Sequence, residues 1–218
     1  MSNEPDTPRG NRTPATGVKG PRADRYTMGA PTPESTRLAG VFLARHGETA
    51  YNAEGRFQGL GRVPLNERGR EQARELAELA SNRGFRELWC SPLVRARETA
   101  DIVAARLGLE PIEDERLIET DTGSWTDRTF ASVSAEDPDG FAAYLRADPD
   151  WGYPGGESFR HQTERVMDAL GEIAQRPAPV LVVCHGMVIR LTLAALGHPV
   201  PAVPNAGLVD LGIPGPVA

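Results

Sequence analysis

The stretch "GVFLARHGETAYN", residues 40–52, decides the fold, because an apolar run of strand length stops abruptly at Arg45 and His46. A second apolar run, "LVVCHG" at residues 181–186, stops in the same way at His185. In an open α/β sheet the parallel strands end at one edge, and ligands bind in the crevice outside those carboxyl ends. The two histidines are therefore expected to meet at one site although they lie far apart in the chain.

Apolar runs of strand length alternate with amphipathic segments of helical length along the chain. The strands are expected at 38–44, 85–90, 111–114, 179–184 and 206–211, and the helices at 66–84, 91–108, 127–148, 156–176 and 186–197. This alternation predicts an α/β fold, a three-layer sandwich with a mostly parallel central sheet covered by helices on both faces. Asn66 is a plausible N-cap, and Ser91 followed by Pro92 is expected to open the next helix.

Length and composition indicate one well-cored domain preceded by a tail. Residues 1–37 are rich in Pro, Gly, Thr and Arg with few apolar side chains, so we expect a disordered tail before a single domain at 38–218. The 218-residue chain has a net charge of −6 with 39% hydrophobic residues, which favours neither a nucleic-acid partner nor a membrane span. The two cysteines, Cys90 and Cys184, are expected to be buried free thiols, and a cytoplasmic location is the simplest prediction.

Arginines accompany the two histidines and indicate the charge of the ligand. Arg45 is adjacent to His46, and Arg95 in "SPLVRARETA" lies near the start of a helix that follows another strand end. Guanidinium groups bind phosphate oxygens in bidentate geometry, and a helix N-terminus attracts anions. Cations beside imidazoles disfavour a metal ion, so no metal is expected. A phosphoryl group is the natural occupant.

The chemistry of such a site follows from its residues. A neutral imidazole is a competent nucleophile toward phosphorus, and nearby positive charge lowers its pKa and keeps it neutral. A carboxyl group must protonate the leaving alkoxide and then deprotonate the attacking water. Glu119 in "RLIETDTGSW" is the first candidate for that carboxyl group, and Asp121 in the same stretch is its rival.

Seven segments in order resemble the histidine phosphatase superfamily, also called the phosphoglycerate mutase-like family: "RHGETAYN", "RFQG", "PLNERGREQA", "SPLVRARETA", "LIETDTGSW", "PGGES" and "VVCHGMVIR". The resemblance implies that His46 is phosphorylated and that Glu119 is the proton donor. It implies that Arg45, Arg95 and His185 bind the phosphoryl group. Its implied substrate-binding positions are Asn52, Gln58, Gly59 and Gly186, the last through its backbone amide.

The resemblance leaves three functions to weigh. Mutases of this family carry a long insertion after the acid that encloses a bisphosphorylated cofactor, whereas the connection from Glu119 to Pro154 is short here. A phosphatase acting on a small phosphorylated metabolite without a cofactor is therefore favoured. The alternatives are a cofactor-dependent phosphoglycerate mutase and a non-catalytic phospho-ligand binding domain. Arg62, in a loop expected near the pocket, suggests a second anionic group on the substrate. Monomer and homodimer both remain open.

Other residues have structural interpretations. Gly47 is expected to let the backbone approach the bound phosphate closely. His161 and His198 are expected at the surface. Trp151 and Tyr153 either pack against a helix end or line the mouth of the pocket.

Overall fold

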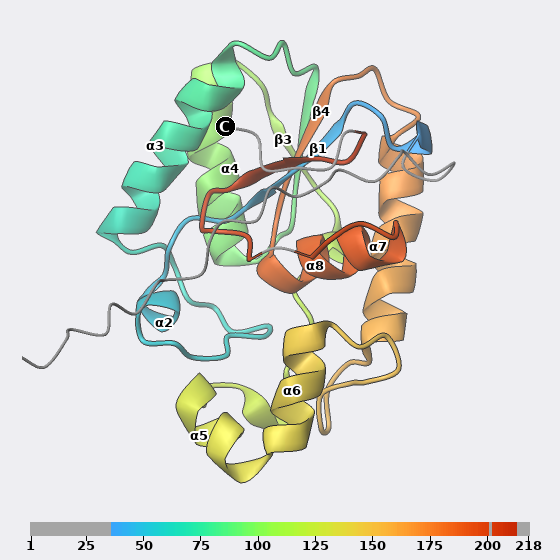
Figure 1. Ribbon diagram of the computed structural model, residues 1–218. Helices are drawn as coiled ribbons and strands as arrows, with labels where there is room; N and C mark the ends of the chain where they lie inside the picture. The colour runs from blue at the N-terminus through green and yellow to red at the C-terminus, as the bar shows by residue number, and fades with distance from the viewer. Residues whose placement is uncertain (1–35, 201, 213–218) are drawn as a thin grey trace, which may run out of the picture.

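The computed structural model describes residues 36–200 and 202–212, and its centre is a five-stranded sheet in the order β3-β2-β4-β1-β5 (Figure 1). The strands are β1 (Val41–Arg45), β2 (Glu87–Cys90), β3 (Pro111–Glu113), β4 (Val180–Cys184) and β5 (Leu208–Asp210). Only the edge strand β5 pairs antiparallel within this sheet, so the predicted mostly parallel sheet is confirmed. The predicted tail falls on residues 1–35 outside the described residues, apart from its last two positions.

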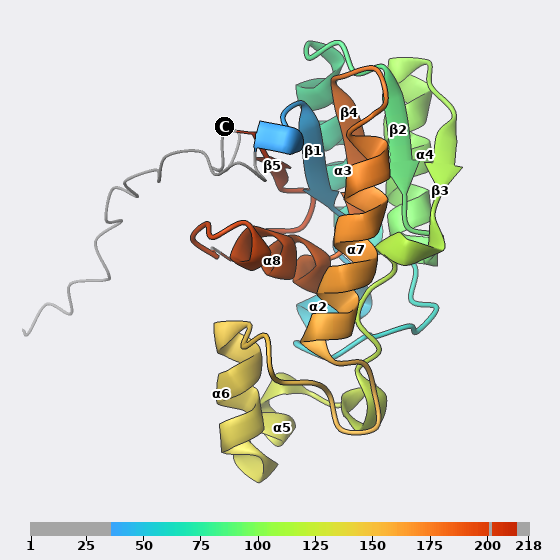
Figure 2. The same ribbon diagram turned by 90° about the vertical axis from the view of Figure 1, so that its right-hand side faces the viewer.

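Helices cover both faces of the sheet (Figures 1 and 2). One face carries α3 (Glu67–Ser81) and α4 (Val94–Leu107), and the other carries α7 (Phe159–Ile173) and α8 (Gly186–Ala195). All five residues of β4 are buried, and alternate side chains enter two different cores. Val182 packs with the α7–α8 side and Val183 with the α3–α4 side, as the two-residue period of a strand requires. The predicted three-layer sandwich is confirmed.

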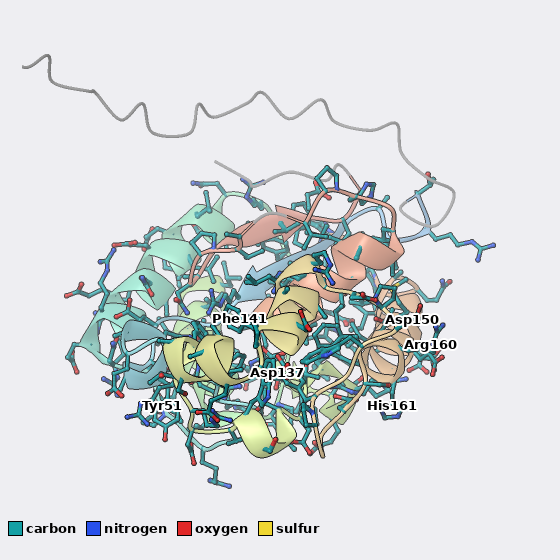
Figure 3. The ribbon with its side chains drawn as sticks, turned by 60° about the horizontal axis from the view of Figure 1, so that its bottom comes forward. Tyr51, Asp137, Phe141, Asp150, Arg160 and His161 are labelled. Carbon is teal, nitrogen blue, oxygen red and sulfur yellow. The ribbon has the colours of Figure 1, made fainter. Side chains whose placement is uncertain are left out.

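Short elements gather beyond the carboxyl ends of the parallel strands, where the strands point in Figure 2. They are α2 (Ala50–Ala53), η1 (Glu115–Leu117), η2 (Gly123–Trp125), α5 (Phe130–Glu136) and α6 (Pro138–Arg146). An aromatic cluster joins this layer to the main domain, with Trp125 packed 5.4 Å from Tyr153, measured between ring centroids. Figure 3 looks onto this layer, with Asp137 labelled at the junction of α5 and α6 and Phe141 labelled on α6.

The helix ends follow the sequence in most places. Asn66 accepts a hydrogen bond from the Gly69 amide at 2.7 Å and caps α3 as predicted. The prediction for α4 is wrong, because the helix begins at Val94 and its N-cap, Leu93, makes no side-chain capping bond. The hydroxyl of Ser91 accepts from the Leu93 amide at 3.2 Å and also bonds to the ring of His185, so this serine joins the start of the helix to the site.

The register of the sheet places the two histidines side by side. Arg45 of β1 is paired with Cys184 of β4, and the chain reaches His46 and His185 at the next step on each strand. The His46 amide donates to the Cys184 carbonyl at 3.0 Å, which extends the ladder one residue beyond the strands. The predicted meeting of the two His-Gly strand ends is therefore confirmed.

Two further predictions concern buried groups. Cys90 and Cys184 are buried free thiols, and burial raises the pKa of both, that of Cys90 to about 12. His161 is exposed on α7, as Figure 3 shows, but the prediction for His198 is wrong, since only 6% of it is exposed. The described parts of the chain contain no helix with the length and apolar character to cross a bilayer.

Candidate active site

His46 lies at the floor of a pocket of about 400 Å³ and is 2% exposed. Its Nδ1 lies 2.7 Å from the Gly47 carbonyl oxygen, which only accepts hydrogen bonds, so Nδ1 carries the proton of the neutral ring. Nε2 therefore has the free lone pair. Burial lowers the pKa of His46 well below its usual value, and the charges of Arg95 and Arg45 lower it further. The ring is neutral near pH 7 and presents a nucleophilic Nε2.

Arg95 is fully buried at the start of α4, and its guanidinium group lies beside that nitrogen. Its Nε donates to Nε2 of His46 at 3.3 Å, and its two terminal nitrogens donate to the carbonyls of Gly59 and Gly61 at 2.9 and 3.0 Å. The carbonyl bonds fix the plane of the guanidinium. Burial lowers the pKa of Arg95 to about 10, which leaves it charged at neutral pH.

Arg45 enters the pocket from the end of β1. Its Nη1 donates to the Val203 carbonyl at 2.7 Å, whereas its buried Nε has no partner within the described protein. A Cβ placed on Gly186 would lie 3.4 Å from that Nε, so the guanidinium lies directly beside the N-terminus of α8. An unpaired buried donor next to a helix N-terminus is a site prepared for an anion.

His185 lies behind His46, with the ring centroids 5.3 Å apart, and it is fully buried. Its Nε2 bonds to the Ser91 hydroxyl at 2.7 Å, and that hydroxyl already accepts from the Leu93 amide. A hydroxyl can donate one hydrogen bond and accept two, so this contact suits either tautomer of the neutral ring, and Nδ1 has no partner in the described structure. Burial, then the charge of Arg95, lowers the pKa of His185 well below its usual value.

Glu119 lines the pocket and Asp121 does not. One oxygen of Glu119 accepts from the Thr120 amide at 2.9 Å, and the other accepts from the Met187 amide in the first turn of α8 at 3.4 Å. Asp121 instead accepts from the Gly123 amide at 3.0 Å, at the first residue of η2. The geometry therefore favours Glu119 as the carboxyl group that serves the pocket.

The loop that carries Glu119 is held by an ion pair that sequence reasoning missed. Arg165 of α7 donates to the carbonyls of Arg116, Ile118 and Glu119 at 2.7, 2.9 and 3.3 Å. The same guanidinium forms two bonds of 2.7 Å with the carboxylate of Glu157. Burial alone would raise the pKa of Glu157, but its bonds to Arg165 lower it overall. The motif "PGGES" draws attention to Glu157, but nothing in the sequence indicates that Arg165 is its partner.

The other predicted binding residues divide into two groups. Asn52, Gln58, Gly59 and Gly186 line the pocket. Arg62 is exposed and does not belong to the lining, so its predicted contact with the substrate stays a prediction. The further lining residues that sequence reasoning did not single out include Arg56, Phe57, Thr122, Phe130, Tyr144, Leu145, Met187, Arg190, Val200, Ala202 and Val203. Tyr153 lines the pocket. Trp151 packs on Phe159, the first residue of α7, with ring centroids 5.0 Å apart. Each of the two predicted roles, lining the pocket and packing against a helix end, therefore applies to one of these residues.

Gly47 has a different purpose from the one expected. A Cβ at this position would lie 2.3 Å from the Gly69 carbonyl oxygen, and one on Gly69 would lie 2.0 Å from that of Glu48. The two glycines let the loop after β1 cross the first turn of α3 in backbone contact. The helix thereby fixes the loop that positions His46.

A residue near the C-terminal edge also supports His46. The Nδ2 group of Asn205 donates to the His46 carbonyl and to Oδ1 of Asn52, both at 3.1 Å. The Ala206 amide donates to the same His46 carbonyl at 3.2 Å. Nothing in the local sequence around Asn205 indicated this role, because the contact forms only when β5 pairs with β1.

Comparison with known proteins decides the family. The sequence model described as "Histidine phosphatase superfamily (branch 1)" matches residues 41–212. The chain belongs to the histidine phosphatase superfamily. Within that superfamily it is 38% identical over 162 residues to a probable phosphoglycerate mutase GpmB of Klebsiella pneumoniae, covering 73% of this chain and 75% of that protein.

Solved structures of superfamily members share the fold. One is a mycobacterial glucosyl-3-phosphoglycerate phosphatase in complex with VO3, with a TM-score of 0.69 and 34% identity over 77% of this chain and 90% of that one. Another is a protein described as mycobacterial hydrolase 1, with a TM-score of 0.71 and 34% identity over 77% and 86% of the two chains. The relatives thus include proteins named as a mutase and as a phosphatase.

Proposed function

We propose that this histidine phosphatase superfamily member hydrolyses phosphomonoesters of small metabolites through a phosphohistidine on His46. The observation that carries the proposal is the convergence on one pocket of a neutral imidazole, two buried guanidinium groups and a carboxyl group. Nε2 of His46 is unprotonated and accepts a 3.3 Å hydrogen bond from Arg95, and Glu119 lines the same pocket. No metal or organic cofactor is required by this chemistry.

In the first step Nε2 of His46 attacks phosphorus and the ester P–O bond breaks. Arg95 and Arg45 hold the phosphoryl oxygens, with the unpaired Nε of Arg45 as a further donor, and the buried His185 supports His46 from behind. Charge on these oxygens is where electrostatic stabilisation contributes most to phosphoryl transfer. Glu119 donates its proton to the leaving alkoxide and so departs from this step as a carboxylate.

In the second step water attacks the phosphohistidine. The Glu119 carboxylate takes a proton from that water as it attacks phosphorus. The P–N bond breaks at the same time, which releases inorganic phosphate and returns His46 to the neutral imidazole. The hydrogen bond from Nδ1 to the Gly47 carbonyl holds the ring of His46 in one orientation throughout both steps. It also keeps the proton on Nδ1, so that Nε2 remains the nitrogen that is phosphorylated.

The choice of phosphatase over mutase rests on the connection between Glu119 and the "PGGES" segment. That connection contains only η2, α5 and α6, which form one wall of a pocket lined by 20 residues in the described structure. A mutase must exclude water from its phosphohistidine, and a short connection is poorly suited to enclosing the ligand. The relative named as a phosphatase supports the same choice.

Hydrolysis of p-nitrophenyl phosphate across pH 5 to 8, with and without vanadate, tests the proposal. We expect turnover by the wild type, inhibition by vanadate and no turnover by His46→Ala. Absence of turnover by the folded wild type on this ester and on a panel of phosphometabolites would overturn it, and would favour a binding domain for phosphorylated ligands.

The mutase is the second candidate because a relative bears that name. Its test is conversion of 3-phosphoglycerate to 2-phosphoglycerate with and without added 2,3-bisphosphoglycerate. We expect release of inorganic phosphate to exceed isomerisation. Isomerisation that depends on the bisphosphate and outpaces hydrolysis would establish the mutase.

A further inference from the structure

Five residues of the pocket lining form what we call the apolar wall: Phe57, Phe130, Tyr144, Leu145 and Tyr153. Four of these come from α5, α6 and the loops that flank them, the layer seen from below in Figure 3. Building on the proposed phosphatase activity, we propose that this wall binds an apolar leaving group. The preferred substrates are then phosphomonoesters whose alcohol carries an extended aliphatic or aromatic body.

The first argument is exposure. In residues 36–200 and 202–212 the exposed large hydrophobic side chains are Leu60, Phe130 and Leu145, and the last two line this pocket. Phe130 is 37% exposed and Leu145 is 56% exposed. Removing such apolar surface from water is favourable, and exposed apolar surface at a pocket marks a place where a ligand is bound.

The second argument is that the wall is already organised. The ring centroid of Phe57 lies 4.6 Å from that of Phe130 and 5.2 Å from that of Tyr144, both edge-to-face. Tyr153 is 4% exposed and lies 6.1 Å from Phe57, also edge-to-face. Interlocked rings offer an apolar surface that loses little side-chain freedom when a ligand covers it.

The third argument is that the arginines beside the wall already have partners. Arg56 forms an ion pair with Glu54 at 2.7 Å and donates to the Asp127 carbonyl at 2.9 Å. Arg190 donates to the Leu145 carbonyl at 2.6 Å and lies 5.4 Å above the ring of Tyr144. These bonds hold α6 against α8. Arg190 therefore supports the wall, and binding of a second anionic group by its remaining N–H groups is the competing use that the test below includes.

The fourth argument concerns sugars. A polyhydroxylated body needs acceptors, but Oδ1 of Asn52 already accepts from Asn205 and Oε1 of Gln58 already accepts from the Thr49 hydroxyl at 2.8 Å. The Thr122 hydroxyl is likewise bonded to that of Thr126 at 2.7 Å. The amide N–H groups of Asn52 and Gln58 remain, and these suit phosphate oxygens. The amide groups of Asn52 and Gln58 therefore serve the phosphate end, and the hydroxyls of Tyr144 and Tyr153 are the neutral polar groups left at the leaving-group end.

The test is a series of n-alkyl phosphates from ethyl to hexyl, assayed by release of inorganic phosphate. Their leaving alcohols have nearly equal acidity, so the chemical step is constant and only apolar area changes along the series. Burial of each added methylene predicts that kcat/KM rises by about fourfold until the wall is covered. Hexyl phosphate is expected to exceed 3-phosphoglycerate as a substrate.

Two variants refine the test. Leu145→Asp places a charge on the wall at an exposed position where folding is not at risk, and it should flatten the rise along the series. Leu60→Ala is the matched control, since Leu60 is 42% exposed and lies outside the pocket lining, and it should leave the rise intact.

The failures are distinguishable. A flat series in an enzyme that hydrolyses p-nitrophenyl phosphate would overturn the apolar site and leave the phosphatase intact. A preference for 3-phosphoglycerate over hexyl phosphate that disappears in Arg190→Met would overturn it in favour of a second anion site. No hydrolysis of any ester by folded protein would overturn the proposed function, and this inference with it.

Discussion

Replacement of Arg165 by Met tests whether the loop that carries Glu119 is held by the buried ion pair. The variant removes both bonds to Glu157 and leaves the carbonyls of Arg116, Ile118 and Glu119 without their donor. The side chains of Arg165 and Glu157 are only 13% and 11% exposed, so solvent screens the pair weakly. Glu157 then keeps only the exposed ring of His161, 2.8 Å away, and removing one partner of a buried pair costs about 3–5 kcal/mol of the free energy of unfolding.

The catalytic effect should exceed what lost stability explains. Displacement of Glu119 by about 1 Å is expected to lower kcat on an alkyl phosphate by about 100-fold in folded enzyme, with little change in KM. The second-order rate constant kcat/KM for p-nitrophenyl phosphate should fall much less, because it reports only the first step and nitrophenolate leaves without a proton from Glu119. A merely structural role would lower both rates equally.

The matched control is Arg160→Met on the same helix. Arg160 pairs with Asp150, and both side chains point outward in Figure 3, at 64% and 76% exposure. An exposed pair contributes little, so this variant should stay within about 0.5 kcal/mol of the wild type with unchanged kcat. Urea unfolding and steady-state kinetics measure both variants. An Arg165→Met protein as stable and as active on alkyl phosphates as Arg160→Met would refute the reasoning.

Two further predictions concern stability. The pKa values of His46 and His185 are depressed in the folded state, so below about pH 6.5 the unfolded chain binds protons that the folded chain does not. The free energy of unfolding should therefore fall with decreasing pH by up to about 1.4 kcal/mol per pH unit for each histidine. Urea unfolding of the His46→Asn, His185→Asn double variant should show no such fall, and a fall as steep as in the wild type would contradict this origin. Gly47→Ala places a methyl group 2.3 Å from the Gly69 carbonyl oxygen and should cost about 2 kcal/mol or more, whereas Gly171→Ala, with no atom within 4 Å of its new methyl, should be neutral or stabilising by up to about 1 kcal/mol in the same assay. Equal stability of the two alanine variants would contradict the packing account.

Much of the site could be predicted because strand ends carry their residues with them. The apolar runs before His46 and His185 fixed two neighbouring parallel strands, and the register then placed the histidines together. Arg95 followed from its position in the first turn of a helix after a third strand end. These predictions needed only periodicity and the rule that parallel strands end at one edge.

Residues whose role depends on the packing of distant segments escaped the sequence. Arg165 reaches Glu119 across the interface between α7 and the loop, and Asn205 reaches His46 through strand β5. Ser91 has the chemistry of an N-cap, but its hydroxyl also bonds to the buried ring of His185, which the local sequence does not indicate. Local propensity says nothing about such competition between partners. Arg62 shows the converse, since this cation lies near a motif in sequence but is exposed and does not line the pocket.

The phosphohistidine itself is the most direct test of the central claim. Wild-type enzyme mixed with a ³²P-labelled phosphomonoester and quenched in alkali during turnover should carry label that acid releases and alkali does not, and peptide mapping should place it on His46. His46→Ala should carry none, whereas Arg160→Met should be labelled like the wild type. Wild-type enzyme that releases phosphate without ever carrying label, or label on a different residue, would contradict the account.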